Sequence, residues 1–139
     1  MKILLILFIS IVSLTGKAQI DYKLSFNKTT QVVTIKLTNM FNEVVYLSPK
    51  IDGSTTATYF TIKYKDINGK ILKTISDYAS IKRTDFLTSK QTKDYHFNLH
   101  RSKVEGVHSI EANVHIEVWN NKYITIFKKD ISEEFLLKE

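Results

Sequence analysis

The sequence predicts an all-β fold, an antiparallel β-sandwich of seven to eight strands. Apolar and polar residues alternate with a period of two through most of the chain, as in strands that bury one face. β-Branched and aromatic residues dominate these runs, and polar segments with glycine or proline separate them. Helical periodicity is almost absent after Gln19, so consecutive strands lack the helical crossovers that parallel pairing requires.

The expected strands follow one another at short spacing. Their approximate ranges are 22–26, 31–39, 43–48, 58–66, 70–76, 93–100, 107–119 and 122–131. The second range shows the pattern most clearly, because Val33, Ile35 and Leu37 share one face and Thr34 and Lys36 lie on the other. The tail SEEFLLKE that follows the last range fits either a final strand or a short helix.

Turn residues mark the connections between these strands. Asn68-Gly69 lies between two apolar runs and is a strong signal for a β-hairpin. The segment SPKIDGST contains Pro49, the only proline of the chain, and predicts a loop. Asn120-Asn121 predicts a two-residue hairpin turn, because asparagine tolerates positive φ.

The chain begins with a segment of different character. Lys2 precedes an apolar run from Ile3 to Val12, and the small residues Gly16 and Ala18 follow. This layout is typical of a secretory signal peptide with a cleavage site before Gln19. The apolar run is shorter than the roughly 20 residues that span a membrane, although an uncleaved anchor is the competing interpretation.

Residues 1–18 are therefore expected to be a signal peptide, and residues 19–139 a single β-sandwich domain in the periplasm or outside the cell. No second long apolar run follows, so no membrane span is expected after cleavage. The chain contains no cysteine. This excludes disulfides, thiolate metal ligands, cysteine nucleophiles and a lipid attached through cysteine.

The charge of the chain does not favour a nucleic-acid partner. The formal net charge is +6, and Lys2 and Lys17 lie in the expected signal peptide. The remaining lysines are scattered, whereas nucleic-acid binding normally uses a concentrated basic stripe. A moderate positive charge favours solubility and a mild attraction to anionic surfaces.

Four segments together resemble small bacterial immunoglobulin-like sandwich domains. They are VTIKLTNMFNEVVYL, FTIKYKDINGKIL, LTSKQTKDYHFNL and GVHSIEANVHI. Their order is similar to that of the bacterial intracellular proteinase inhibitor family, which implies an immunoglobulin-like fold. The chain departs from that pattern at His108, where a tyrosine is usual, and at Ser89-Lys90, where a Pro-Gly turn is usual. No segment matches an inhibitory loop, so the resemblance bears on fold more than on function.

Residue types suited to catalysis are present, but no motif arranges them. No GxSxG turn holds a serine in a strained position, and the segment Asp66–Gly69 is followed by Lys70 where a calcium loop needs an oxygen ligand. His115 and Glu117 share one strand face but supply only two of the three or four ligands of a stable zinc site. We therefore predict no catalytic residue, no metal site and no cofactor.

The segment from His108 to Val118 predicts which face of the last hairpin is buried. Since side chains alternate on a strand, its even positions face the core and its odd positions face away. The outward positions are Ser109, Glu111, Asn113, His115 and Glu117, followed by Trp119. His108 is expected to hydrogen-bond a neighbouring loop through its ring, by analogy with the tyrosine of similar sandwiches.

A two-residue turn at Asn120-Asn121 fixes the register of the last hairpin. The resulting outward pairs are Trp119–Lys122, Glu117–Ile124 and His115–Ile126. Trp119, Ile124 and Ile126 then gather on the outward face with His115 beside them, and an exposed apolar cluster with an aromatic residue is a candidate contact surface. The competing interpretation is that a loop or the tail residues 135–137 cover this cluster.

These observations predict an exported, non-catalytic binding module. Its partner would be another protein or a second copy of the chain, bound through the last hairpin. A proteinase-inhibitor-like domain is the first alternative, and it depends on the family resemblance alone. A small secreted hydrolase, with a site assembled only in three dimensions, is the second.

Overall fold

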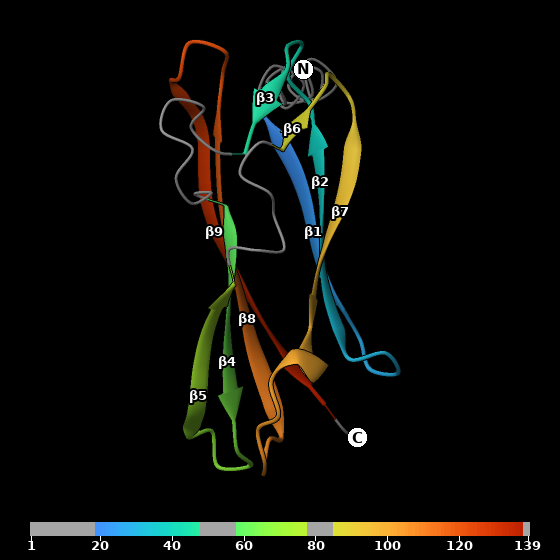
Figure 1. The fold of residues 1–139 in the computed structure, drawn as a ribbon, viewed down its shortest axis with the longest axis vertical. Helices are drawn as coiled ribbons and strands as arrows, with labels where there is room; N and C mark the ends of the chain where they lie inside the picture. Colours follow the sequence, from blue (N-terminus) through green and yellow to red (C-terminus); the bar gives the residue numbers. More distant parts are fainter. Residues whose placement is uncertain (1–18, 48–57, 78–84, 138–139) are drawn as a thin grey trace, which may run out of the picture.

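The computed structural model describes residues 19–47, 58–77 and 85–137, and this part of the chain is all-β (Figure 1). Its one helical element is a short 3₁₀ turn, η1 (Leu99–Arg101). The strands are β1 (Ile20–Asn27), β2 (Val32–Asn39), β3 (Val45–Tyr46), β4 (Tyr59–Lys65), β5 (Ile71–Asp77), β6 (Phe86–Leu87), β7 (Thr92–Asn98), β8 (Ser109–Trp119) and β9 (Thr125–Leu136).

The strands form two antiparallel sheets around one apolar core, as in a β-sandwich. The first sheet has the order β1-β2-β7. In the second sheet, β8 is central. Along one edge it pairs with β9, and along the other it pairs first with β4 and then, at Trp119, with β3. β5 and β6 extend this sheet beyond β4 and β3.

The alternation expected along β8 is confirmed from Ile110 onward, whereas Ser109, which was expected to face outward, is buried. Ile110, Ala112, Val114, Ile116 and Val118 are all 0% exposed, and the residues between them, from Glu111 onward, are half-buried. These five side chains belong to a core that both sheets share, together with residues of β2, β4 and β7. Burying one face in this way fixes the register of every strand paired with β8.

His108 differs from the expectation. It lies half-buried just before β8, where its backbone N–H donates to the Lys65 carbonyl at 2.8 Å and its carbonyl accepts from Leu137 at 3.1 Å. Its ring makes no hydrogen bond within the described ranges. The connection predicted for the side chain is made by the main chain instead.

The last hairpin also differs, because its turn has three residues rather than two. Asn120 pairs with Ile124, so that Asn121, Lys122 and Tyr123 form the loop. The side-chain oxygen of Asn120 accepts the backbone N–H groups of Lys122 at 2.9 Å and of Ile124 at 3.1 Å. These two hydrogen bonds select a three-residue loop that ends with Tyr123 at φ +61°, and a loop of this kind is accompanied by a β-bulge.

The predicted outward pairing of the hairpin is therefore wrong. The pairs in the structure are Trp119–Thr125, Val118–Phe127, Glu117–Lys128 and His115–Asp130, with Ile126 as the bulged residue. Lys122 and Ile124 belong to the turn and not to the ladder. Because the expected pairs of Ile124 and Ile126 do not form, the register does not gather these residues with Trp119 on the outward face.

The hairpin between β4 and β5 uses the same turn. Asp66 takes the place of Asn120, and its carboxylate accepts the N–H groups of Asn68 and Lys70, both at 2.9 Å. Gly69 stands at φ +82°, where the last hairpin has Tyr123. The predicted Asn68-Gly69 hairpin is confirmed, with Gly69 supplying the left-handed conformation that side chains disfavour.

The bounds of several other strands differ from the predicted ranges. Strand β3 is shorter than its predicted range, strand β6 was not predicted, and the ambiguous tail continues β9 as far as Leu136. The predicted signal peptide and the predicted Pro49 loop lie outside the described residues. No helix in the described ranges is long and apolar enough to cross a membrane.

The two matched turns allow a direct test of backbone strain. We expect Gly69→Ala to destabilise the protein by about 1 kcal/mol, since a left-handed conformation disfavours any Cβ and a Cβ there would meet nothing within 4 Å. Tyr123→Gly should instead stabilise by about 0.5 kcal/mol by removing the same strain. Urea denaturation measures both changes. A loss of stability in Tyr123→Gly would mean that contacts of the tyrosine ring outweigh its strain.

Candidate functional site

The predicted contact residues lie at and below the tip of the β8–β9 hairpin. We define the hairpin tip as residues 119–125. Ile124 is 56% exposed and Tyr123 is 44% exposed, whereas Trp119 is half-buried beside Tyr46 of β3. Ile126 packs partly against the core. The structure thus places Trp119 and Ile124 at the same turn and separates Ile126 from them.

His115 lies further along the hairpin, and its ring is enclosed by polar partners. Nδ1 is 2.7 Å from an oxygen of Asp130, and Nε2 is 3.3 Å from an oxygen of Glu117. The ring stacks against Tyr59 with centroids 5.4 Å apart, and the side chain is 14% exposed. Both ring nitrogens are therefore occupied within the chain, which leaves no lone pair directed at a substrate.

The prediction that His115 and Glu117 share one face is confirmed by this contact. Asp130 adds a second carboxylate from the neighbouring strand. Even so, no group of three or more histidine, aspartate and glutamate residues in the described part of the chain is arranged to hold a metal ion. The cluster holds together β4, β8 and β9 on their outward face.

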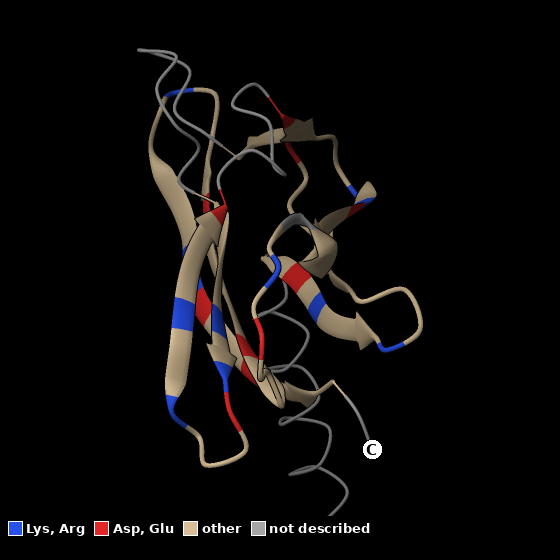
Figure 2. Cartoon of the chain, turned by 60° about the horizontal axis from the view of Figure 1, so that its bottom comes forward, with Lys and Arg blue, Asp and Glu red and all other residues tan. Residues whose placement is uncertain are grey.

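A charge network continues along the same face. The ammonium group of Lys65 lies 3.0 Å from Glu111 and 3.7 Å from Glu134. The hydrogen bond from Lys65 lowers the pKa of Glu111, and Glu111 in turn raises the pKa of Lys65. Lys65 and Glu111 are half-buried and Glu134 is exposed, and ion pairs at a solvent-facing surface contribute little to stability. Figure 2 shows the same mixture over the ribbon, with acidic and basic residues interspersed.

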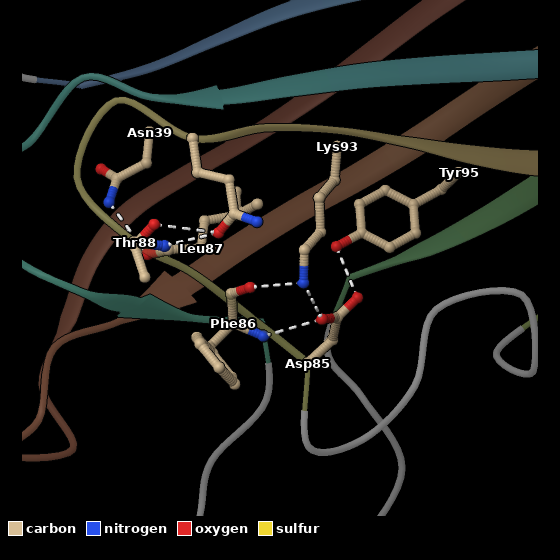
Figure 3. Close-up of polar contacts among 8 residues, drawn as sticks. Asn39, Asp85, Phe86, Leu87, Thr88, Lys93 and Tyr95 are labelled. Atoms are coloured by element: carbon tan, nitrogen blue, oxygen red, sulfur yellow. Dashed lines mark hydrogen bonds and ion pairs between the residues drawn. The ribbon is translucent and has the colours of Figure 1, made fainter.

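Sequence reasoning missed a polar cluster around Asp85, which stands just before β6 (Figure 3). One oxygen of its carboxylate accepts from Lys93 at 2.7 Å, and the other accepts from the Tyr95 hydroxyl at 2.6 Å. Lys93 also donates to the Phe86 carbonyl at 2.9 Å and lies over the Phe86 ring. Since Lys93 and Tyr95 belong to β7, this cluster ties the two sheets together.

The contacts of Asp85 change the pKa of its carboxyl group. Burial acts to raise its pKa, but hydrogen bonds from Lys93 and Tyr95 and the charge of Lys93 outweigh that effect and lower the pKa. Burial, and then the Asp85 carboxylate, raise the pKa of Tyr95 far above its usual range. The pair is thus a carboxylate and a neutral phenol, which makes Tyr95 a fixed donor rather than a proton carrier.

Asn39 forms a second buried tie next to this cluster. Its side chain is fully buried and donates to the carbonyls of Glu43 at 2.7 Å and Leu87 at 3.1 Å, while it accepts from the N–H of Phe41. A buried amide is tolerated only when its donors and acceptors are satisfied. The contacts hold the turn after β2 against β6, which is a structural role.

The opposite end of the molecule carries an open depression of about 420 Å³. It is lined by apolar side chains that include Tyr64, Val104, Val107 and Leu137, with His100 at its polar side. The Tyr64 hydroxyl bonds the Ser102 side chain, and burial raises the pKa of Tyr64. Apart from that bond, no polar group of the described chain is buried and directed into the depression.

Comparisons with known proteins do not assign the chain to a family. No protein-family model matches it, and no curated protein matches it. One solved structure, a Northeast Structural Genomics Consortium target, is 13% identical over 84% of this chain and 80% of its own, with a TM-score of 0.49.

Two further solved structures have similarly low sequence identity to this chain. A Bordetella pertussis protein with the provisional name ApaA is 13% identical over 85% of this chain and 88% of its own, with a TM-score of 0.48. A protein from Archaeoglobus fulgidus is 11% identical over 87% and 97% of the two chains, with a TM-score of 0.35. Similarities at this level carry no argument about family or activity.

The Asp85 cluster predicts a pH-dependent contribution to stability. A carboxyl whose pKa is lowered by folding stabilises the native state above its unfolded pKa of about 3.9, and this contribution disappears as the pH falls through the folded pKa. We therefore expect Asp85→Asn to cost about 1.5–3 kcal/mol at pH 7 and clearly less at pH 2. Denaturation with urea at both pH values measures the difference.

Asp94→Asn on the exposed face of β7 is the matched control. It should change stability by no more than about 0.5 kcal/mol at either pH, as is usual for surface sites. An equal cost of Asp85→Asn at both pH values would show that the charge of Asp85 contributes nothing.

Proposed function

We propose that the protein is an exported, non-catalytic binding module with an immunoglobulin-like sandwich fold. The two antiparallel sheets around a common core support the fold assignment. The signal-like segment before Gln19 supports export. The occupied ring nitrogens of His115 and the fixed roles of Asp85 and Tyr95 support a role in binding rather than catalysis.

The observation that carries this proposal is the conformation of Tyr123. This bulky residue has a φ of +61° and is 44% exposed. The matching turn between β4 and β5 has Gly69 at that position, which is the residue that adopts such a conformation at little cost. Gln31 and Lys90 also have a positive φ, but Tyr123 combines that strain with a large exposed aromatic side chain, and backbone strain is concentrated at functional sites.

The composition of the hairpin tip suits a protein partner. Tyrosine and tryptophan are the residues that most often dominate protein interfaces, and Ile124 adds apolar surface beside them. Lys122 is exposed in the same turn and supplies a polar rim. The tip therefore offers a small aromatic anchor that would be buried upon binding.

This proposal predicts that stability and binding respond separately at the tip. Ile124→Ser should change the free energy of unfolding by only about 0.5 kcal/mol, because its side chain is exposed. Tyr123→Gly should leave the fold intact as well. Both variants should nevertheless weaken capture of the partner from the native host at least tenfold, since buried interface anchors contribute about 2 kcal/mol or more.

Ile116→Ala provides the contrasting control. It deletes packing in the core and should destabilise by about 2–5 kcal/mol, while folded molecules keep the tip surface. Trp119→Ser should fall between the two classes, because Trp119 is half-buried. Capture that persists unchanged in both tip variants would remove the hairpin tip as the contact surface.

The proposed export predicts where the mature chain begins. Intact-mass analysis of protein recovered after export should show a chain that begins at Gln19, because Gly16 and Ala18 occupy the positions that the cleaving peptidase requires. Ala18→Leu should block cleavage, whereas Ser13→Ala should not. A wild-type mass that retains residues 1–18 would indicate an anchor in place of a cleaved signal.

A further inference from the structure

Strand β9 forms a long edge of the second sheet. It pairs with β8 along its whole length, and no other strand of the described chain pairs with it. The twelve residues from Thr125 to Leu136 therefore present a row of backbone N–H and C=O groups on the free side. Such an edge is a template for another strand unless the protein blocks it.

The side chains of this edge are arranged symmetrically about Ile131. Two lysines, Lys128 and Lys129, precede it, and two glutamates, Glu133 and Glu134, follow at matching distances. Phe127 and Phe135 lie outside the charged pairs at equal spacing, and the bulge at Ile126 ends the regular stretch. In an antiparallel pair of two copies centred on Ile131, each residue would face the residue at the mirror-related position of the second copy.

We propose that β9 pairs antiparallel with β9 of a second copy of this chain, with Ile131 on the twofold axis. The second sheet of one copy then joins the second sheet of the other copy, and together they form one continuous sheet across the dimer. The facing pairs are Phe127–Phe135, Lys128–Glu134, Lys129–Glu133 and Ile131–Ile131. Each charged pair occurs twice, because the interface is symmetric.

Compared with the registers shifted by two residues, which keep the same faces of the two strands together, only this one places each lysine opposite a glutamate. Directly opposite residues on antiparallel strands lie on the same face and interact, and like charges in that position destabilise. A shift of two residues in one direction places Glu134 opposite Asp130, and in the other it places Glu133 opposite Phe127. Parallel pairing in register would place lysine opposite lysine.

The contacts within the monomer leave two of the four charged groups without a partner. Glu133 and Lys128 are exposed and have no ion pair or hydrogen bond within the described residues. Lys129 lies over the Tyr22 ring at 5.2 Å, and Glu134 accepts from the Ser109 hydroxyl at 3.1 Å and lies 3.7 Å from Lys65. Half of the charge set thus has no partner until a second copy supplies one.

Inward-pointing charges at an edge strand can also serve to prevent pairing. Lys129 and Glu133 lie on the inward side, opposite Ile116 and Ala112 of β8. Protection alone needs charge but no particular spacing, so that two lysines would serve as well as a lysine and a glutamate. The mirror-related placement about Ile131 is what favours pairing.

This interface is separate from the hairpin tip, and neither proposal requires the other. Loss of dimerisation in a β9 variant would leave partner capture through Tyr123 and Ile124 intact. Conversely, the tip variants should dimerise as the wild type does. The two surfaces can therefore fail independently in experiments.

Single-cysteine variants provide the first test, because the chain has no cysteine of its own. In Ile131→Cys the two thiols would face each other across the axis at a Cα separation of about 4.5–5.5 Å, which permits a disulfide. In the control Glu133→Cys they would lie about 14 Å apart. The full chain, purified after export, should form a covalent dimer with the first variant and not with the second.

A charge swap provides the second test, with sedimentation velocity as the measurement. The wild type should sediment as a dimer, and Lys129→Glu should weaken dimerisation about tenfold by placing two glutamates opposite each other on both sides of the axis. Adding Glu133→Lys to that variant should restore the wild-type affinity. A monomeric wild type, no rescue by the swap, or equal cross-linking at positions 131 and 133 would overturn the proposal.

Discussion

The alternation of buried and outward side chains along β8 is the constraint on which the rest of the structure depends. β8 pairs with β3, β4 and β9, and five of its side chains are completely removed from solvent. A slip of one residue would turn this whole apolar set outward. The register of the second sheet, and with it the placement of both the hairpin tip and the β9 edge, follows from this one strand.

The first sheet is held against this frame by packing and by a few buried polar ties. Phe60 of β4 meets Phe97 of β7 with ring centroids 6.1 Å apart, and the Asp85 cluster bonds residues on either side of the sandwich. No buried side-chain nitrogen or oxygen in the described residues lacks a partner. A polar group inside a core is costly unless it is bonded, so these ties specify one arrangement of the two sheets.

The sequence was informative where a feature depends on a repeating pattern and uninformative where it depends on single contacts. Period-two alternation predicted the long strands, because each supplies several residues to one face. β6 has only two residues and carries no such period. The register of the last hairpin depended on two hydrogen bonds that the Asn120 side chain accepts, which favour a three-residue loop over the two-residue turn that composition suggested. Asp85 and Tyr95 showed no signal, since their contact arises only when the two sheets meet.

Strand β9 satisfies two different constraints at once. Its inward face must complete the core, and Phe135 does so by packing its ring 5.5 Å from that of Phe26 in β1. Its free edge must either repel other strands or select one, and charge alone does not distinguish these outcomes. The order of the charges does, because a strand whose two halves carry opposite signs repels a parallel copy and attracts an antiparallel one. Selectivity for a second copy can therefore be encoded in the same residues that keep the edge from pairing with unrelated strands.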